Sequence, residues 1–266
     1  MSDTSALFVA NGDAFVPTEL TRGGWDDVTQ HGSPPSGLLA RAVDLVPTVV
    51  PMQVVRFTVD LFRRVPISPL TVETVVRRDG KRIQVLDAFL RSADVEVGRV
   101  SVLKIRTADL PFEPLSLEWN PPPPPEEVPT FDWNDNFGDR GIARFHHDAV
   151  EIRSVGGSFG VLGPGLSWFR LLVPVVAGEE PSAFVRLATI ADLSNGNSQS
   201  IDPHQWIFVN PDITLYSHRL PVDEWVGMKS LARQHRSGIG MADTLVFDRE
   251  GPLGRINQAQ LLDHRV

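Results

Sequence analysis

The sequence contains the same succession of extended segments twice. The first-half segments are FTVDLFRRVP (57–66), LTVETVVRR (70–78), IQVLDAFLR (83–91) and VGRV (97–100), and the second-half segments are DITLYSHRLP (212–221), WVGMKS (225–230), IGMADTLVF (239–247) and LGRI (253–256). The prolines that end the first pair lie 155 residues apart, the next segments start 155 apart, and the closing segments start 156 apart. Repetition at one spacing predicts two copies of one structural unit.

Composition excludes several classes of protein. The 266 residues include no cysteine, which rules out a disulfide scaffold, a thiol nucleophile and a cysteine-ligated metal. The net charge of −8, with no basic cluster, argues against nucleic-acid binding, because phosphate neutralisation needs grouped lysines and arginines. The N-terminal sequence lacks the pattern of a signal peptide, and no apolar run approaches the ~20 residues of a membrane span. We therefore expect a cytoplasmic protein.

A proline-rich segment separates the two copies. The chain reads LPFEPLSLEWNPPPPPEEVPT from residue 110 to residue 130, and five consecutive prolines occupy positions 121–125. Each proline ring fixes φ and removes a hydrogen-bond donor, so this run is extended and semi-rigid. We expect an N-terminal unit over residues 1–110, a linker over 111–130 and a C-terminal unit over 131–266.

Each copy also contains one apolar helix. In the first half, Pro34 and Pro35 suit a helix start with Ser33 as the cap, which predicts a helix from about Ser36 to Val46. In the second half a helix is expected from about Pro181 to Leu193. The Arg78-Asp79-Gly80-Lys81 segment is typical of a tight hairpin turn in which glycine takes a positive φ. The predicted fold is α+β, with two antiparallel sheets, each wrapped around a central helix.

Four stretches of sequence, two in each half, resemble a known family. HGSPPSGLLARAVD with VVRFTVDLFRRVP in the first half, and RLATIADLSNG with WIFVNPDITLYSHRLPVDEWVG in the second, are similar to the TesB-like acyl-CoA thioesterases. The resemblance covers nearly the whole chain and implies a tandem (double) hotdog fold. It also implies hydrolysis of fatty acyl-CoA to free acid and CoA by an activated water, with no cofactor.

The same resemblance implies the site residues. Enzymes of this family hold the attacking water with an Asp, a Thr or Ser, and a Gln, which correspond here to Asp192, Asn210 and Gln258. The hydroxyl position reads asparagine, and Thr214 stands four residues further along the expected strand, on the same face. Gln260 is an alternative to Gln258 for the same reason. Asparagine can still orient a water, since its amide both donates and accepts hydrogen bonds.

The two copies differ at these positions. A spacing of 155 residues places Asn210 opposite Val55 and Gln258 opposite Leu103, and neither apolar side chain can hold a water. One catalytic centre is therefore expected in each chain, built around Asp192. Exposed sheet edges favour further pairing, so a homodimer is a second expectation.

Other motifs fit no catalytic pattern. His146-His147-Asp148 is not spaced as a metal site on a strand, where adjacent side chains point to opposite faces, and the glycines of 156–165 lack the Gly-Lys-Ser/Thr of a phosphate loop. No serine lies in a G-x-S-x-G elbow. Two alternatives to a thioesterase stay open. One is a non-catalytic acyl-CoA or acyl-carrier binding protein, and the other is a hotdog dehydratase or hydratase with His31 as its histidine.

Overall fold

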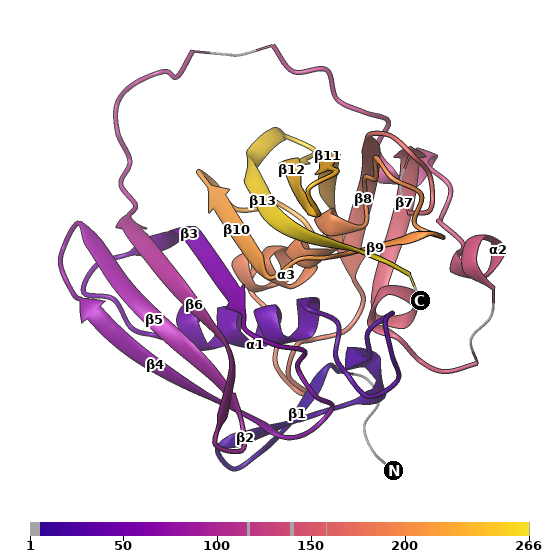
Figure 1. Ribbon diagram of the computed structural model, residues 1–266. Helices are drawn as coiled ribbons and strands as arrows, with labels where there is room; N and C mark the ends of the chain where they lie inside the picture. Colours follow the sequence, from indigo (N-terminus) through magenta and orange to yellow (C-terminus); the bar gives the residue numbers. More distant parts are fainter. Residues whose placement is uncertain (1–5, 116–117, 139–140, 158, 266) are drawn as a thin grey trace.

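The computed structural model describes residues 6–115, 118–138, 141–157 and 159–265. Figure 1 shows two sheets that continue into each other around two helices. The first half contains β1 (Phe8–Asn11), β2 (Ala14–Pro17), a short 3₁₀ turn (Glu19–Thr21), α1 (Ser33–Asp44), β3 (Met52–Leu61), β4 (Leu70–Arg78), β5 (Ile83–Ser92) and β6 (Val95–Arg106).

The second half repeats this succession with additions. It contains a 3₁₀ turn (Pro125–Glu127), α2 (Trp133–Phe137), a π-helical turn (Phe145–Ala149), β7 (Val150–Gly156), β8 (Gly165–Leu171), α3 (Ala183–Ile190), a 3₁₀ turn (Ala191–Asn195), β9 (Trp206–Val209), β10 (Asp212–Ser217), β11 (Val226–His235), β12 (Ile239–Asp248) and β13 (Gly251–His264).

Strand order shows the duplication directly. The first-half strands lie in the order β1-β2-β4-β5-β6-β3, and the second-half strands continue in the mirrored order β10-β13-β12-β11-β8-β7. Because β3 and β10 pair antiparallel at the centre, the two predicted sheets form one 13-stranded sheet, in which β9 pairs with β13. This arrangement is the double hotdog of the α+β class.

Hydrogen-bond register corrects the spacing of the repeat. Ile83 pairs with Ile105 in the first half, and Ile239 pairs with Leu261 in the second, so counterparts lie 156 residues apart. The same value follows from Thr58 with Ser101 and Thr214 with Asn257. The sequence-based spacing of 155 was one residue short because its first two segments were matched by their ends rather than by their pairing.

The corrected spacing changes the counterparts of two site residues. Asn210 corresponds to Val54 rather than Val55, and Gln258 corresponds to Val102 rather than Leu103. Both valines are buried, at 5% and 0% exposure. At the corrected positions both counterparts are therefore still apolar side chains.

The two long helices pack against each other on the inner face of the sheet. α1 begins at Ser33, three residues earlier than predicted, with Gly32 as its N-cap and no side-chain cap. Its Leu38 and Leu39 are fully buried. Where it crosses α3, Gly37 leaves no room for a side chain, because an added Cβ would lie 2.4 Å from Thr189 Oγ1. This close approach brings the start of α1 to the end of α3.

Two other local predictions need correction. The β4–β5 connection spans residues 79–82, and Gly80 is not among the glycines with positive φ, so the predicted primed turn is wrong. α3 is shorter than predicted and begins after Ser182, whose Oγ accepts a hydrogen bond from the Val185 amide at 3.2 Å. Its last predicted turn is 3₁₀ rather than α-helical.

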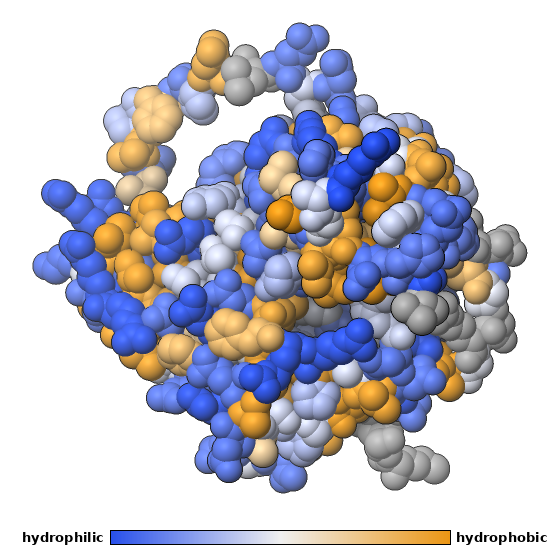
Figure 2. Space-filling view, viewed as in Figure 1, coloured by the Kyte–Doolittle hydropathy of each residue, from blue (hydrophilic) through white to orange (hydrophobic). Residues whose placement is uncertain are grey.

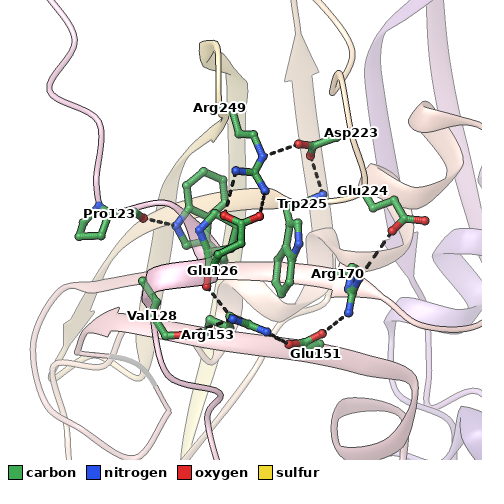
Figure 3. Close-up of polar contacts among 12 residues, drawn as sticks. Pro123, Glu126, Val128, Glu151, Arg153, Arg170, Asp223, Glu224, Trp225 and Arg249 are labelled. Atoms are coloured by element: carbon green, nitrogen blue, oxygen red, sulfur yellow. Dashed lines mark hydrogen bonds and ion pairs between the residues drawn. The ribbon is translucent and has the colours of Figure 1, made fainter.

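The proline-rich strap leaves the body after β6 and returns on the second half (Figure 1). Apolar side chains lie in the open along its first part (Figure 2), where Leu110, Phe112 and Leu115 are exposed. Its far end is fixed, since Trp168 Nε1 donates to Pro123 O at 2.9 Å and Glu126 pairs with Arg249 (Figure 3). The five prolines therefore connect the halves as a docked strap rather than a free hinge.

A second network lies beside the docked strap. The Trp225 ring lies between Arg153 and Arg170, with guanidinium carbons 5.2 and 5.0 Å from its centroid, and both arginines pair with Glu151 (Figure 3). These contacts are structural, because none of the four residues lines the large cavity described below. No helix within the described residues has the length and apolar character needed to cross a membrane.

Candidate active site

Asp192 lies on the wall of a cavity between the two halves. The 3₁₀ turn that ends α3 turns its side chain toward the start of α1, and only 6% of the residue is exposed. The cavity has a volume of about 710 Å³. Its lining includes His31 and Gly32 before α1, and Leu193 and Asn210 from the second half. The pairing of the two units therefore creates the cavity.

Three side chains surround the Asp192 carboxylate. Asn210 Nδ2 donates to Oδ1 at 2.7 Å, and Gln258 Nε2 lies 3.4 Å from the same oxygen. On the opposite side, His31 Nδ1 lies 2.9 Å from Oδ2. Gly32 makes this approach possible, because a Cβ at that position would lie 2.7 Å from Oδ2. The three predicted site residues thus come together, and a histidine from the other half joins them.

These contacts keep Asp192 ionised. Burial acts to raise the pKa of Asp192, but the His31 charge, the His31 and Asn210 hydrogen bonds and the Gly32 amide outweigh it, so the pKa lies below its ordinary value. His31 Nδ1 is also 3.1 Å from the Ser33 amide nitrogen. A carboxylate oxygen can only accept, so the Asp192 contact assigns the imidazole proton to Nδ1. A protonated Nδ1 cannot also accept from the Ser33 amide, so the Ser33 contact is not a hydrogen bond in this tautomer.

The structure separates Gln258 from its alternative. Ser194 Oγ donates to Gln258 Oε1 at 2.5 Å, which turns Nε2 toward Asp192. Gln260 faces elsewhere, since its Nε2 donates to Asn195 Oδ1 at 2.7 Å and its Oε1 accepts from Gln234. Gln258 is therefore the glutamine that faces Asp192.

Asn210 and Thr214 do not share a strand, contrary to the prediction. Asn210 lies in the bend between β9 and β10, and only Thr214 belongs to β10. Thr214 Oγ1 lies 3.4 Å from Thr58 Oγ1 at the centre of the sheet, whereas the Asn210 amide contacts Asp192. Because Asn210 is not part of a strand, its side chain does not follow strand alternation. The even spacing between residues 210 and 214 therefore does not place their side chains on one face.

Sequence reasoning missed His31 as a partner of Asp192. It was considered only for a dehydratase, on the basis of its place before a helix. No sequence signal shows that the start of α1 meets the end of α3, because that contact depends on the pairing of the two units. The ring also packs against Phe145, with centroids 5.1 Å apart.

The other histidine candidates also lie at the cavity. His146 and His147 are in a π-helical turn rather than the predicted strand, they line the same cavity as Asp192, and their rings pack against Trp133 with centroids 4.6 and 5.0 Å away. No group of metal-ligating side chains was found among the residues that the structure describes. Trp168 and Trp225 belong to a separate apolar cluster away from the cavity.

Family comparison gives this site its context. The profile of the acyl-CoA thioesterase C-terminal domain matches residues 124–262, and that of the N-terminal domain matches residues 21–105. The chain belongs to the TesB-like acyl-CoA thioesterase family. Comparison with curated protein sequences gives no match.

Solved structures with this fold resemble the chain over nearly its full length. A putative thioesterase from Novosphingobium aromaticivorans has 19% identity and a TM-score of 0.73, with 97% of this chain and 98% of that chain covered. A hot dog fold protein of unknown function from Alicyclobacillus acidocaldarius has 14% identity and a TM-score of 0.72, covering 99% and 98%. Acyl-CoA thioesterase II TesB2 from Mycobacterium marinum has 13% identity and a TM-score of 0.67, covering 98% and 96%. At these identities the likeness establishes the fold.

Proposed function

We propose that the protein hydrolyses fatty acyl-CoA to free acid and CoA at Asp192, Asn210 and Gln258. The observation that carries this proposal is the hydrogen-bonded cluster of these three side chains. Two of them, Asp192 and Asn210, line the large cavity. Their residue types can hold one water, with an ionised carboxylate to accept its proton and amides to fix its orientation.

The proposed reaction needs no covalent acyl-enzyme intermediate. The water oxygen attacks the thioester carbonyl carbon, one of its protons moves to the Asp192 carboxylate, and the C–S bond breaks as the tetrahedral intermediate collapses. The proton then passes to the thiolate of CoA. The lowered pKa makes Asp192 a weak base, but a thioester carbonyl is already activated toward attack, so a carboxylate that orients and polarises the water suffices.

The developing oxyanion lies near the start of α1 in this proposal. Gly32 is the N-cap of that helix and lines the cavity, and α1 runs for 12 residues. The first amides of a helix carry partial positive charge that stabilises an anion. The same helix start therefore supports both the carboxylate of Asp192 and the charge of the reacting carbonyl.

The rim of the cavity suits a CoA thioester. Arg63, Arg64 and Arg265 line it, although the whole chain carries a net charge of −8. Phosphate groups such as those of CoA are recognised by arginine, whose planar fork matches their oxygens. Apolar side chains, among them Phe62 and Phe159, line other parts of the cavity and are available to the acyl chain.

The experiment is a thiol-release assay with acyl-CoAs of several chain lengths. Steady release of free CoA by the wild type, and its loss in Asp192→Asn, is the expected result. Binding of acyl-CoA with no release at any chain length would instead favour the non-catalytic binding protein.

A hydratase is the second candidate, because His31 lies 2.9 Å from Asp192 in the same cavity. A histidine beside a carboxylate can move protons at the carbons next to a thioester as well as activate a water. Incubation with a trans-2-enoyl-CoA separates the two: a hydratase forms the hydroxyacyl-CoA and leaves the thioester intact, whereas a thioesterase releases CoA.

A further inference from the structure

The first half contains a second cavity at the position that mirrors the active site. It has a volume of about 390 Å³ and lies where the chain leaves α1, beside Phe184 at the start of α3. The active-site cavity has the inverse placement, at the end of α3 beside the start of α1. Because the strand order of the two halves is mirrored, the duplication accounts for both cavities.

The second cavity cannot repeat the chemistry of the first. Val54 on its wall corresponds to Asn210, and Val102 corresponds to Gln258. Lys104 stands where the second half has Gln260, as the pairings Gln84 with Lys104 and Gly240 with Gln260 show. The first half therefore has apolar side chains in place of Asn210 and Gln258, and the second cavity has an amine.

Lys104 is an unusual residue to find at this place. It is only 4% exposed, and its Nζ donates to the Val46 carbonyl at 2.9 Å. Within the described part of the chain no second hydrogen-bond acceptor for Nζ is present, whereas an ammonium group has three N–H donors. Burial lowers the pKa of Lys104, and the charge of Asp44 opposes that shift. A buried ammonium with unused donors favours an anion in the adjoining space.

The other residues that line the second cavity indicate which kind of anion it can bind. Val46, Val54 and Leu220 give an apolar surface beside the amine, which suits an aliphatic chain. Asp44 also lies on this wall and repels a multiply charged phosphate more than a single carboxylate. We propose that the second cavity binds an aliphatic carboxylate, with its head group on Lys104 and its chain along Val46, Val54 and Leu220.

Calorimetric titration with decanoate at pH 7 tests this site. Lys104→Met keeps the length of the side chain without its charge, and it should weaken one class of decanoate site by about tenfold or more. Lys229→Met, which removes an exposed lysine on β11, is the matched control and should leave the isotherm unchanged. The Lys104→Met substitution should not change decanoate binding in the larger cavity, so the titration distinguishes that site from the second cavity. Identical isotherms for the wild type and Lys104→Met would overturn the proposal.

A second measurement needs no variant. The chain has three lysines, Lys81, Lys104 and Lys229, so isotopically labelled lysine gives few side-chain NMR signals. Decanoate should shift the Lys104 signal and raise its titration midpoint, since an anion favours the charged amine. Decan-1-ol, with the same chain and no charge, should do neither, and inorganic phosphate should act more weakly. Three lysine signals unmoved by saturating decanoate, or an equal response to phosphate, would refute the assignment.

This inference does not depend on the proposed hydrolysis. Neither measurement uses turnover, so a protein that releases no CoA can still bind decanoate at Lys104. Conversely, an active thioesterase whose Lys104 is insensitive to decanoate would retain the proposed function and lose the second site.

Discussion

Replacement of Asp192 by asparagine tests the catalytic role of the carboxylate separately from its role in folding. In the wild type, Oδ1 accepts from Asn210 at 2.7 Å and Oδ2 faces His31 Nδ1 at 2.9 Å. An asparagine of the same shape keeps an acceptor toward Asn210, and its NH2 group can donate to His31 Nδ1 once the imidazole proton moves to Nε2. The variant should therefore fold and bind acyl-CoA, because it loses mainly the charge.

The expected loss is in turnover. Without the carboxylate the water has no base, so kcat should fall by roughly 10² to 10⁴, the range typical of a lost general base, with little change in affinity for acyl-CoA. The cost in stability is smaller, about 1 to 2 kcal/mol, since the ionic character of the hydrogen bonds is lost while their geometry remains.

Two measurements check this expectation. Thiol release gives kcat and KM with acyl-CoA, and calorimetry with the unreactive variant gives the affinity directly. Circular dichroism and thermal unfolding of the variant establish that it is folded. Hydrolysis by Asp192→Asn at the wild-type rate would refute the site. If the variant loses both activity and structure, Asp192→Glu and Asn210→Ala distinguish a loss of catalysis from a loss of folding.

Four further expectations follow from the same geometry. Asn210→Thr restores the residue usual in the family and should preserve or raise kcat, and a fall of tenfold or more would contradict a water-holding role for this position. Gly32→Ala places a Cβ 2.7 Å from Asp192 Oδ2 and should lower kcat while costing about 1 to 3 kcal/mol in the free energy of unfolding by urea. Because the native pKa of Asp192 is lowered, its stabilising effect relative to Asp192→Asn should be complete above about pH 4, the range of an unfolded aspartate, and should vanish as pH falls through the native pKa; unfolding midpoints that differ equally at pH 7 and pH 2.5 would argue against this. Trp168→Phe loses the hydrogen bond to Pro123 O and should cost about 1 kcal/mol in unfolding free energy with unchanged kcat, so a large loss of activity would show that the strap affects the site.

The sequence by itself determined the architecture of the chain. Strand segments repeated at one spacing specify two copies of one unit, because alternating side chains and turn residues act locally and each copy carries its own pattern. The same information placed Asp192 at the end of a helix and made the two copies unequal at Asn210 and Gln258. The predicted spacing of 155 residues was one residue too short. The end of a strand segment in the sequence does not show which residue it pairs with, and only the hydrogen-bonded pairs define the register.

Tertiary structure alone decided which groups meet. His31 and Asp192 come from different copies and touch only because α1 and α3 pack closely at Gly37 and Thr189. Likewise, the choice of Gln258 over Gln260 depends on the Ser194 hydroxyl that orients its amide. Side-chain positions such as these follow from the packing of segments far apart in the chain, and no local pattern records that packing.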